Sequence, residues 1–196
     1  MMVCVVIPVG PGHQELAGAA KVSVLRAWAC SRGPFTDLQV VPVADHDGRL
    51  GRSRARNVGL DVPADWHFLL DADDEMMPNA FGFVDLAASA TFGAVCLNGQ
   101  PYIRDRQPVT RETIFEHGAH GTLSMGCFVR GDLGLRFNEG LDVGEDFDFY
   151  LRLPDFTKRT AALVSIGYDH PSAGGPRGYH EIDWREICRR VIDGYR

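Results

Sequence analysis

In the first half of the chain, apolar runs typical of strands alternate with segments whose apolar positions have helical spacing. Residues 3–9 (VCVVIPV) form a continuous β-branched run ended by proline and glycine, which predicts a strand buried on both faces of a parallel sheet. Apolar positions recur at roughly helical spacing over 14–29, and the run 38–45 predicts a second strand that ends in acids. Residues 49–60 predict a second helix and 66–73 a third strand. This βαβαβ order is typical of an α/β sheet, which binds ligands outside the carboxyl ends of its strands.

The pattern loosens in the second half of the chain. A helix at 79–88 and a strand at 92–97 continue the alternation, and residues 99–120, rich in Gly, Pro, His and Arg, predict a loop or hairpin. The later predicted elements are a strand at 124–131, a helix at 144–153, a strand at 161–168 and an amphipathic helix at 183–195. The sequence contains no repeat and no low-complexity linker, so we expect a single domain.

Composition narrows the functional classes. The chain has 196 residues, 45% of them apolar, which is enough for a real core. Its net charge of −6 argues against a generic nucleic-acid coat, because nonspecific phosphate binding requires clustered positive charge. The 5 cysteines are far apart and lack a CxxC pair, which indicates reduced thiols in a cytoplasmic protein. The N-terminal apolar run is too short to span a bilayer, so no transmembrane or targeting segment is expected.

Four acidic residues crowd the predicted end of the third strand in HFLLDADDEM (67–76). Crowded carboxylates repel one another and lose hydration on burial, so such a cluster needs a cation or a strong set of donors. The spacing DxD occurs three times (Asp45/Asp47, Asp71/Asp73 and Asp146/Asp148), but only the middle copy directly follows an apolar strand. Mg²⁺ or Mn²⁺ is one interpretation, since alternate carboxylates can hold a hard ion with positions open for phosphate. A solvated turn or a helix cap is the other.

Three further segments carry a resemblance to a known family. The motif GEDFDFYLRL (144–153) has acids where a helix begins, RSRARNVGL (52–60) lies between the second and third strands, and VVIPVGPG (5–12) ends the first. In order and spacing these segments and the acidic cluster resemble glycosyltransferase family two. The resemblance implies a GT-A-like, Rossmann-like α/β fold with a mostly parallel central sheet flanked by helices. Residues 1–98 would form a nucleotide-sugar-binding half, and 99–196 an acceptor and catalytic half of the same domain.

The resemblance also implies a metal-dependent transfer from a UDP- or GDP-sugar. Asp73 would bind Mn²⁺ or Mg²⁺ directly, Asp71 would lie near the ribose or the metal shell, and Asp74 would assist the shell or cap the next helix. His170 is a further candidate metal ligand, with His180 behind it. The candidate donor-binding residues are Pro8, Val9, Asp45, Asp47, Arg56, Asn57, Asp71 and Ala72. A purely structural role for the arginine, bracing the acidic loop, remains an alternative.

Asp146 is the predicted general base of an inverting transfer, and Glu145 would orient the acceptor. A base must lie on the face opposite the leaving group, where it takes the proton of the attacking hydroxyl. Both acids would also simply favour a helix N-terminus, and spacing does not settle which of the two faces the cleft.

Two other functions remain as alternatives. A sugar-nucleotide nucleotidyltransferase would share the sheet and the metal chemistry, but the segment VGPGHQEL (9–16) lacks the basic residue expected after its first strand. A catalytically silent nucleotide-sugar-binding protein would have no use for both acidic motifs.

The sequence leaves the acceptor of the transfer open: a saccharide, a lipid-linked sugar, a protein side chain or a modified nucleic-acid base. The oligomeric state is not determined by the sequence.

Overall fold

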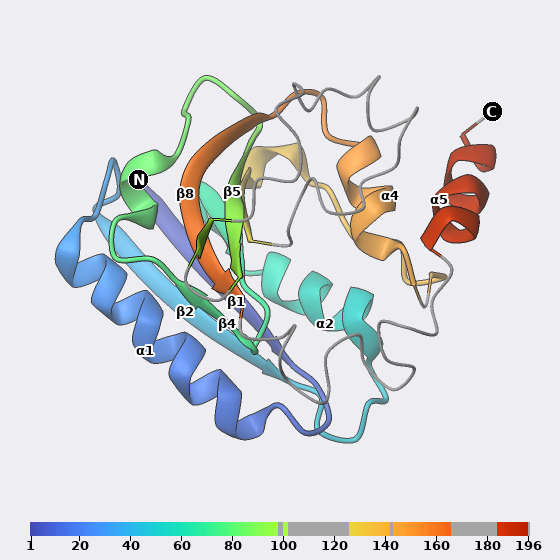
Figure 1. Cartoon of the computed structure of the whole chain (residues 1–196), viewed down its shortest axis with the longest axis horizontal. Helices are drawn as coiled ribbons and strands as arrows, with labels where there is room; N and C mark the ends of the chain where they lie inside the picture. Colours follow the sequence, from blue (N-terminus) through green and yellow to red (C-terminus); the bar gives the residue numbers. More distant parts are fainter. Residues whose placement is uncertain (98–99, 102–125, 142, 166–183, 196) are drawn as a thin grey trace.

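A computed structural model of the chain describes residues 1–97, 100–101, 126–141, 143–165 and 184–195 (Figure 1). Its strands are β1 Met2–Val9, β2 Asp37–Ala44, β3 Trp66–Leu69, β4 Asp74–Met76, β5 Ala90–Leu97, β6 Gln100–Pro101, β7 Cys127–Arg130 and β8 Thr157–Ser165. Its helices are α1 Gln14–Cys30, α2 Gly51–Leu60, α4 Glu145–Leu151 and α5 Trp184–Asp193, with the 3₁₀ turns η1 Ala80–Phe83 and η2 Gly131–Leu133. The strands form one sheet in the order β2-β1-β3-β7-β5-β8-β4, with β6 paired to β5.

The first strand lies inside the sheet, and its side chains alternate between two cores. Val3, Val5 and Ile7 face the core that is covered by α1, whereas Cys4 and Val6 face the core on the side of α2 and α4. All five side chains are fully buried. The continuous apolar run is therefore explained by burial on both faces, as predicted.

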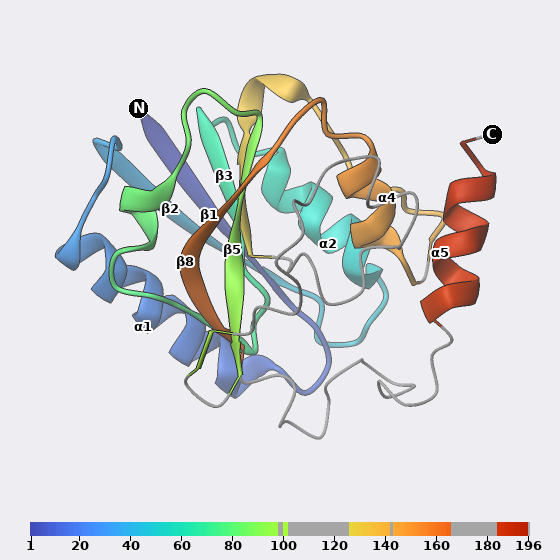
Figure 2. The ribbon, with the colours of Figure 1, turned by 45° about the horizontal axis from the view of Figure 1, so that its top comes forward.

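Helix α2 packs on the face of the sheet opposite α1 (Figures 1 and 2). A Cβ atom added at Gly59 would lie 2.1 Å from a methyl carbon of Val6, so only glycine allows this approach. The close packing brings the polar face of α2, which carries Arg56 and Asn57, against the ends of the central strands. Both views place α4 beside α2, and α5 on the outer side of α4.

The predicted α/β fold class, with one central sheet flanked by helices, is confirmed, but the sheet is mixed rather than mostly parallel. Strand β1 pairs in parallel with β2 and β3, and β5 pairs in parallel with β8. The other pairs are antiparallel, because β7 returns between β3 and β5 and because β4 and β6 join the second half of the sheet in the opposite direction. Strand direction depends on long-range connections that the local pattern does not contain.

Two predicted elements are wrong in extent or type. The strand predicted at 66–73 ends at Leu69, and the chain turns before it forms β4 at the far edge of the sheet. The helix predicted at 79–88 is only the turn η1, since Gly82 weakens helix propensity and the Asp85 carboxylate accepts the Ala87 N–H within a local turn. Phe81 of η1 is fully buried in an aromatic cluster, which fixes this turn by tertiary packing.

The C-terminal helix agrees with the prediction at 183–195. Ile187 and Val191 of α5 are buried, and Cys188 and Ile192 pack against the same core. Among the described helices, none combines the length and the apolar character that a membrane span requires.

Candidate active site

A buried arginine joins two of the acidic motifs. Arg56 of α2 donates from Nη2 to Asp71 Oδ1 and from Nη1 to Glu145 Oε1, each at 2.9 Å. These partners lie 15 and 89 residues away along the chain. The guanidinium also lies over the ring of Phe137, 5.2 Å from its centroid. The strand-end cluster and the start of α4 therefore form one site, linked by the Arg-Asn segment.

The electrostatics of this link depend on its burial. The side chains of Arg56 and Glu145 are 6% and 5% exposed, whereas Asp71 is 34% exposed. Burial alone would lower the pKa of the Arg56 guanidinium, but the charges of Asp71 and Glu145 outweigh it and hold that pKa above its ordinary value. Arg56 therefore stays charged, and Glu145 has a fixed partner inside the protein.

Asp146 lies in a different environment from Glu145. Its side chain is half-buried at the start of α4, and Oδ1 accepts the backbone N–H of Phe147 at 2.7 Å. Burial raises the pKa of Asp146 to about 6, the negative charge of Glu145 adds to the increase, and Arg56 opposes it. Asp146 is consequently a stronger base than an ordinary aspartate.

The segment 71–74 forms a turn at the end of the central strands. The Asp71 carbonyl accepts the N–H of Asp74 at 3.0 Å, so the chain reverses there. Asp73 is half-buried, Asp74 is buried, and Ala72 is 2% exposed and packs in the core. Ala72 is therefore almost wholly covered in this structure.

The strand-end acids suit a metal site that a diphosphate completes. Within the described ranges no group of three or more His, Cys, Asp or Glu side chains could hold a metal ion by itself. Magnesium sites commonly use one or two carboxylates together with substrate phosphates, and Asp71 and Asp73 match that donor set. The candidate ligands His170 and His180 lie outside the described residues, as do residues 102–120 of the predicted loop or hairpin.

The predicted base-reading acids lie after β2. Asp45 is buried, and its two carboxylate oxygens accept the N–H groups of Leu50 and Gly51, each at 2.9 Å. Asp47 is exposed and pairs with Arg49 at 3.1 Å. The structure thus gives Asp45 a capping role at the start of α2, and its predicted contact with a nucleotide base stays a prediction.

Asn57 holds the segment that leads into α4. Its Nδ2 donates to the Phe137 carbonyl at 3.0 Å and to Glu139 Oε1 at 2.9 Å, and its Oδ1 accepts the Phe137 N–H at 2.7 Å. Asn57 therefore braces a loop in this structure. Pro8 is half-buried and Val9 is buried at the end of β1, where Val9 accepts the N–H of Asp45.

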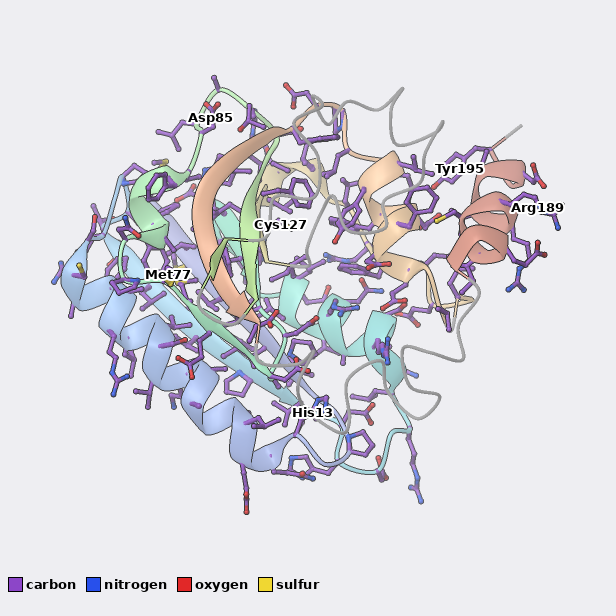
Figure 3. All side chains as sticks on the ribbon, viewed as in Figure 1. His13, Met77, Asp85, Cys127, Arg189 and Tyr195 are labelled. Carbon is purple, nitrogen blue, oxygen red and sulfur yellow. The ribbon has the colours of Figure 1, made fainter. Side chains whose placement is uncertain are left out.

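Sequence reasoning missed the contacts between α4 and α5. Gly144, which precedes Glu145, has φ +85°, and a Cβ there would lie 2.5 Å from Ile187 of α5. Asp148 accepts hydrogen bonds from Tyr195 at 2.7 Å and from Arg152 at 2.6 Å. Figure 3 shows Tyr195 beside α4. The glycine before the Glu-Asp pair was the available signal, since a positive φ at a helix start favours glycine.

Comparison with known structures identifies the fold. No protein-family model and no curated protein matches the sequence. Among solved structures, S. aureus TarS 1–349 aligns with a TM-score of 0.61 at 18% identity over 97% of this chain. The catalytic domain of Drosophila β1,4-galactosyltransferase 7, solved with xylobiose, aligns with a TM-score of 0.57 at 14% identity over 96% of the chain and 79% of that domain. The chain has the GT-A fold.

A third structure of this fold is glucosyl-3-phosphoglycerate synthase from Mycobacterium tuberculosis, solved with Mn²⁺, UDP and glucosyl-3-phosphoglycerate. It aligns with a TM-score of 0.55 at 16% identity over 97% of this chain and 77% of its own. TarS 1–349 has also been solved with UDP and with UDP-GlcNAc. The present chain spans 64% of TarS 1–349.

Proposed function

We propose that this chain is a glycosyltransferase that moves a sugar from a UDP- or GDP-sugar to an acceptor hydroxyl with inversion, and that it uses Mn²⁺ or Mg²⁺. The observation that supports this proposal is the buried Arg56, which brings the strand-end acids and the Glu-Asp pair of α4 into one site. Residues 1–98 would bind the donor, and 99–196 would supply the base and receive the acceptor.

The charge of the site favours a cation-bound donor. Asp71 and Glu145 bind the buried guanidinium of Arg56, and its charge also acts on Asp146, so three carboxylates face one guanidinium and a bare diphosphate would meet net negative charge. A divalent ion held by Asp73, with Asp71 beside it and His170 as a further proposed ligand, would stabilise the departing diphosphate as a Lewis acid. Pro8, Val9, Asp47 and the backbone of Ala72 remain the proposed donor contacts at the strand ends.

The base assignment follows from the two environments of the acidic pair. Glu145 has an oxygen bound by Arg56 at 2.9 Å inside the protein, so its carboxylate is already engaged in an ion pair. Asp146 has a pKa of about 6, close to the working pH that suits a general base. Asp146 therefore takes the proton of the acceptor hydroxyl as that oxygen attacks the anomeric carbon, and Glu145 keeps Arg56 in place.

Donor hydrolysis is the most direct test. The protein is incubated with UDP- and GDP-sugars and Mn²⁺, and release of the nucleoside diphosphate is measured. We expect slow, metal-dependent release with one donor. A protein that shows a thermal shift with the donor but never releases nucleotide is a silent binder. Formation of pyrophosphate from a sugar phosphate and a nucleoside triphosphate would instead identify a nucleotidyltransferase.

The acceptor is proposed only by class: a saccharide, a lipid-linked sugar, a protein side chain or a modified nucleic-acid base. Mass spectrometry of products, with the active donor and one acceptor of each class, assigns it. A DNA gel shift at two salt concentrations tests the last class separately, because binding through phosphates weakens steeply with salt.

A further inference from the structure

Tyr150 of α4 carries a buried hydroxyl without a partner. Its side chain is 1% exposed, and its ring packs edge-on against Phe92 at 5.0 Å between centroids. Among the residues that the structure describes, none forms a hydrogen bond with the phenolic oxygen. Burial of an unbonded hydroxyl is costly, and native proteins rarely leave such a group unused.

Tyr150 lies one helical turn after the proposed base, close enough for the charge of Asp146 to act on the phenol. Tyr150 follows Asp146 by four residues in α4, so the two side chains lie on the same face of the helix. Long helical side chains lean toward the N-terminus, which carries the phenol over the turn that presents Asp146. Because Asp146 uses Oδ1 for the Phe147 N–H, its Oδ2 is the oxygen left for the phenol.

The charged and titratable groups around the phenol keep it protonated. Burial raises the pKa of Tyr150 well above its ordinary value, and the charges of Asp146, Cys127 and Asp71 raise it further, whereas Arg56 opposes them. These groups come from α4, β7, the segment after β3 and α2; Figure 3 shows Cys127 on the sheet side of the site. The hydroxyl is therefore a hydrogen-bond donor at every working pH.

Another carboxylate of α4 already has a phenol partner, which comes from the chain just after α5. Tyr195 donates its hydroxyl to Asp148 Oδ1 at 2.7 Å, so α4 already has one carboxylate fixed by a phenol. We propose that Tyr150 is a positioning residue for Asp146: the ionised carboxylate turns its Oδ2 to accept a hydrogen bond from the phenol, a bond that this structure does not contain, and is thereby held toward the acceptor hydroxyl. The acceptor proton goes to Asp146, and Tyr150 keeps its own. The inference rests on the proposed function of Asp146.

Tyr150→Phe tests this proposal, because it keeps the ring and deletes only the hydroxyl. The carboxyl carbon of Asp146 is titrated by ¹³C NMR in the wild type and the variant, with Asp146→Asn to assign the signal. We expect the pKa of Asp146 to rise by about one pH unit in the variant, since the ionised form loses a donor. Tyr195→Phe is the matched control and should leave that pKa where it is. An Asp146 titration that is the same in wild type and Tyr150→Phe overturns the proposal.

Turnover gives a second readout. The variant should lose roughly tenfold in kcat with an unchanged KM for the donor, and the acid side of its pH profile should move upward with the NMR value. A rise in acceptor KM with an unmoved pH profile would assign the phenol to the substrate and would overturn the positioning role. The NMR titration needs no turnover, so a wild type that releases no nucleotide contradicts the proposed function while the link between the two residues is still measured.

Discussion

Two acidic segments with the same spacing follow the two strands that flank β1, and they differ in every contact. After β2, both oxygens of Asp45 cap α2, and Asp47 lies exposed beside Arg49. After β3, Asp71 meets the buried Arg56, which also binds Glu145. The DxD spacing is identical in the two segments, so the spacing alone does not indicate which segment is part of the candidate active site.

The difference comes from the partner that each segment meets. Backbone N–H groups at a helix start satisfy Asp45 locally, within six residues. The charge of Asp71 is balanced by a guanidinium that also reaches a helix from the other half of the chain. A local cap stabilises one helix, whereas a shared buried cation fixes the relative position of two motifs. Experiments that remove one partner at a time can separate these two roles.

Removal of the shared cation should have the largest effect. Arg56→Met leaves the buried Glu145 and the partly buried Asp71 without their ion pair, which should lower the free energy of unfolding by about 3–5 kcal/mol. Urea denaturation followed by circular dichroism measures it. The matched control is Arg49→Met at the other segment, whose exposed pair should contribute less than about 0.5 kcal/mol. Equal losses in the two variants would contradict the comparison.

Asp73→Asn should have the second-largest effect. Loss of one carboxylate ligand should weaken Mn²⁺-dependent binding of UDP by about 10–100-fold, while the free energy of unfolding stays nearly unchanged. Calorimetric titration with UDP, with and without Mn²⁺, measures the affinity. Asp37→Asn, an exposed acid at the start of β2, is the control and should bind as the wild type does. Normal turnover by the Asp73 variant would remove this residue from the site.

Asp45→Ala should destabilise the protein through the loss of a cap. Two backbone N–H groups lose their acceptor, so the free energy of unfolding should fall by about 1 kcal/mol. Denaturation in the absence of nucleotide isolates this effect from any role in binding. If the stability were unchanged while the affinity for UDP fell, Asp45 would be a nucleotide contact and its capping role would be minor.

The smallest effect should be a gain in stability from Asp146→Asn. The folded-state pKa of about 6 lies above the ordinary value of Asp, so the folded protein binds more protons between about pH 4 and 6. Wild-type stability therefore falls as the pH rises through that window. At pH 7 the variant should be more stable than the wild type, and the gap should close below pH 4. Transfer by the variant should be lost at every pH.

The sequence predicted the elements whose burial pattern is local. The first strand, the first two helices and the last helix end close to their predicted boundaries, because each has a clear period or a clear stop. The prediction of a helix at 79–88 was wrong, because the packing of Phe81 and the turn at Asp85 outweigh the helical spacing of the sequence. The mixed sheet was beyond prediction, since strand direction in the second half depends on how distant segments return.

The sequence supplied the candidate site residues, whose roles stay predictions, but not the contacts between them. Asp71, Glu145 and Asp146 were identified by their places after a strand and before a helix. That Arg56 would join two of them could not be read from the sequence, because the contact spans 89 residues. The roles of Asn57 as a brace for Phe137 and of Gly144 as a contact point for α5 depend on packing in the same way.

The contact of α5 with α4 has a consequence for heat inactivation. Helix α5 contacts Gly144 just before α4, Tyr195 beyond α5 binds Asp148, and an open pocket of about 810 Å³ lies between α5 and the segment 136–143. A terminal helix beside such a pocket opens at a lower free energy than a central sheet. Warming should thus detach α5 first and release the backbone that presents Glu145 and Asp146. The proposed sugar transfer should stop at a temperature at which the sheet is still intact.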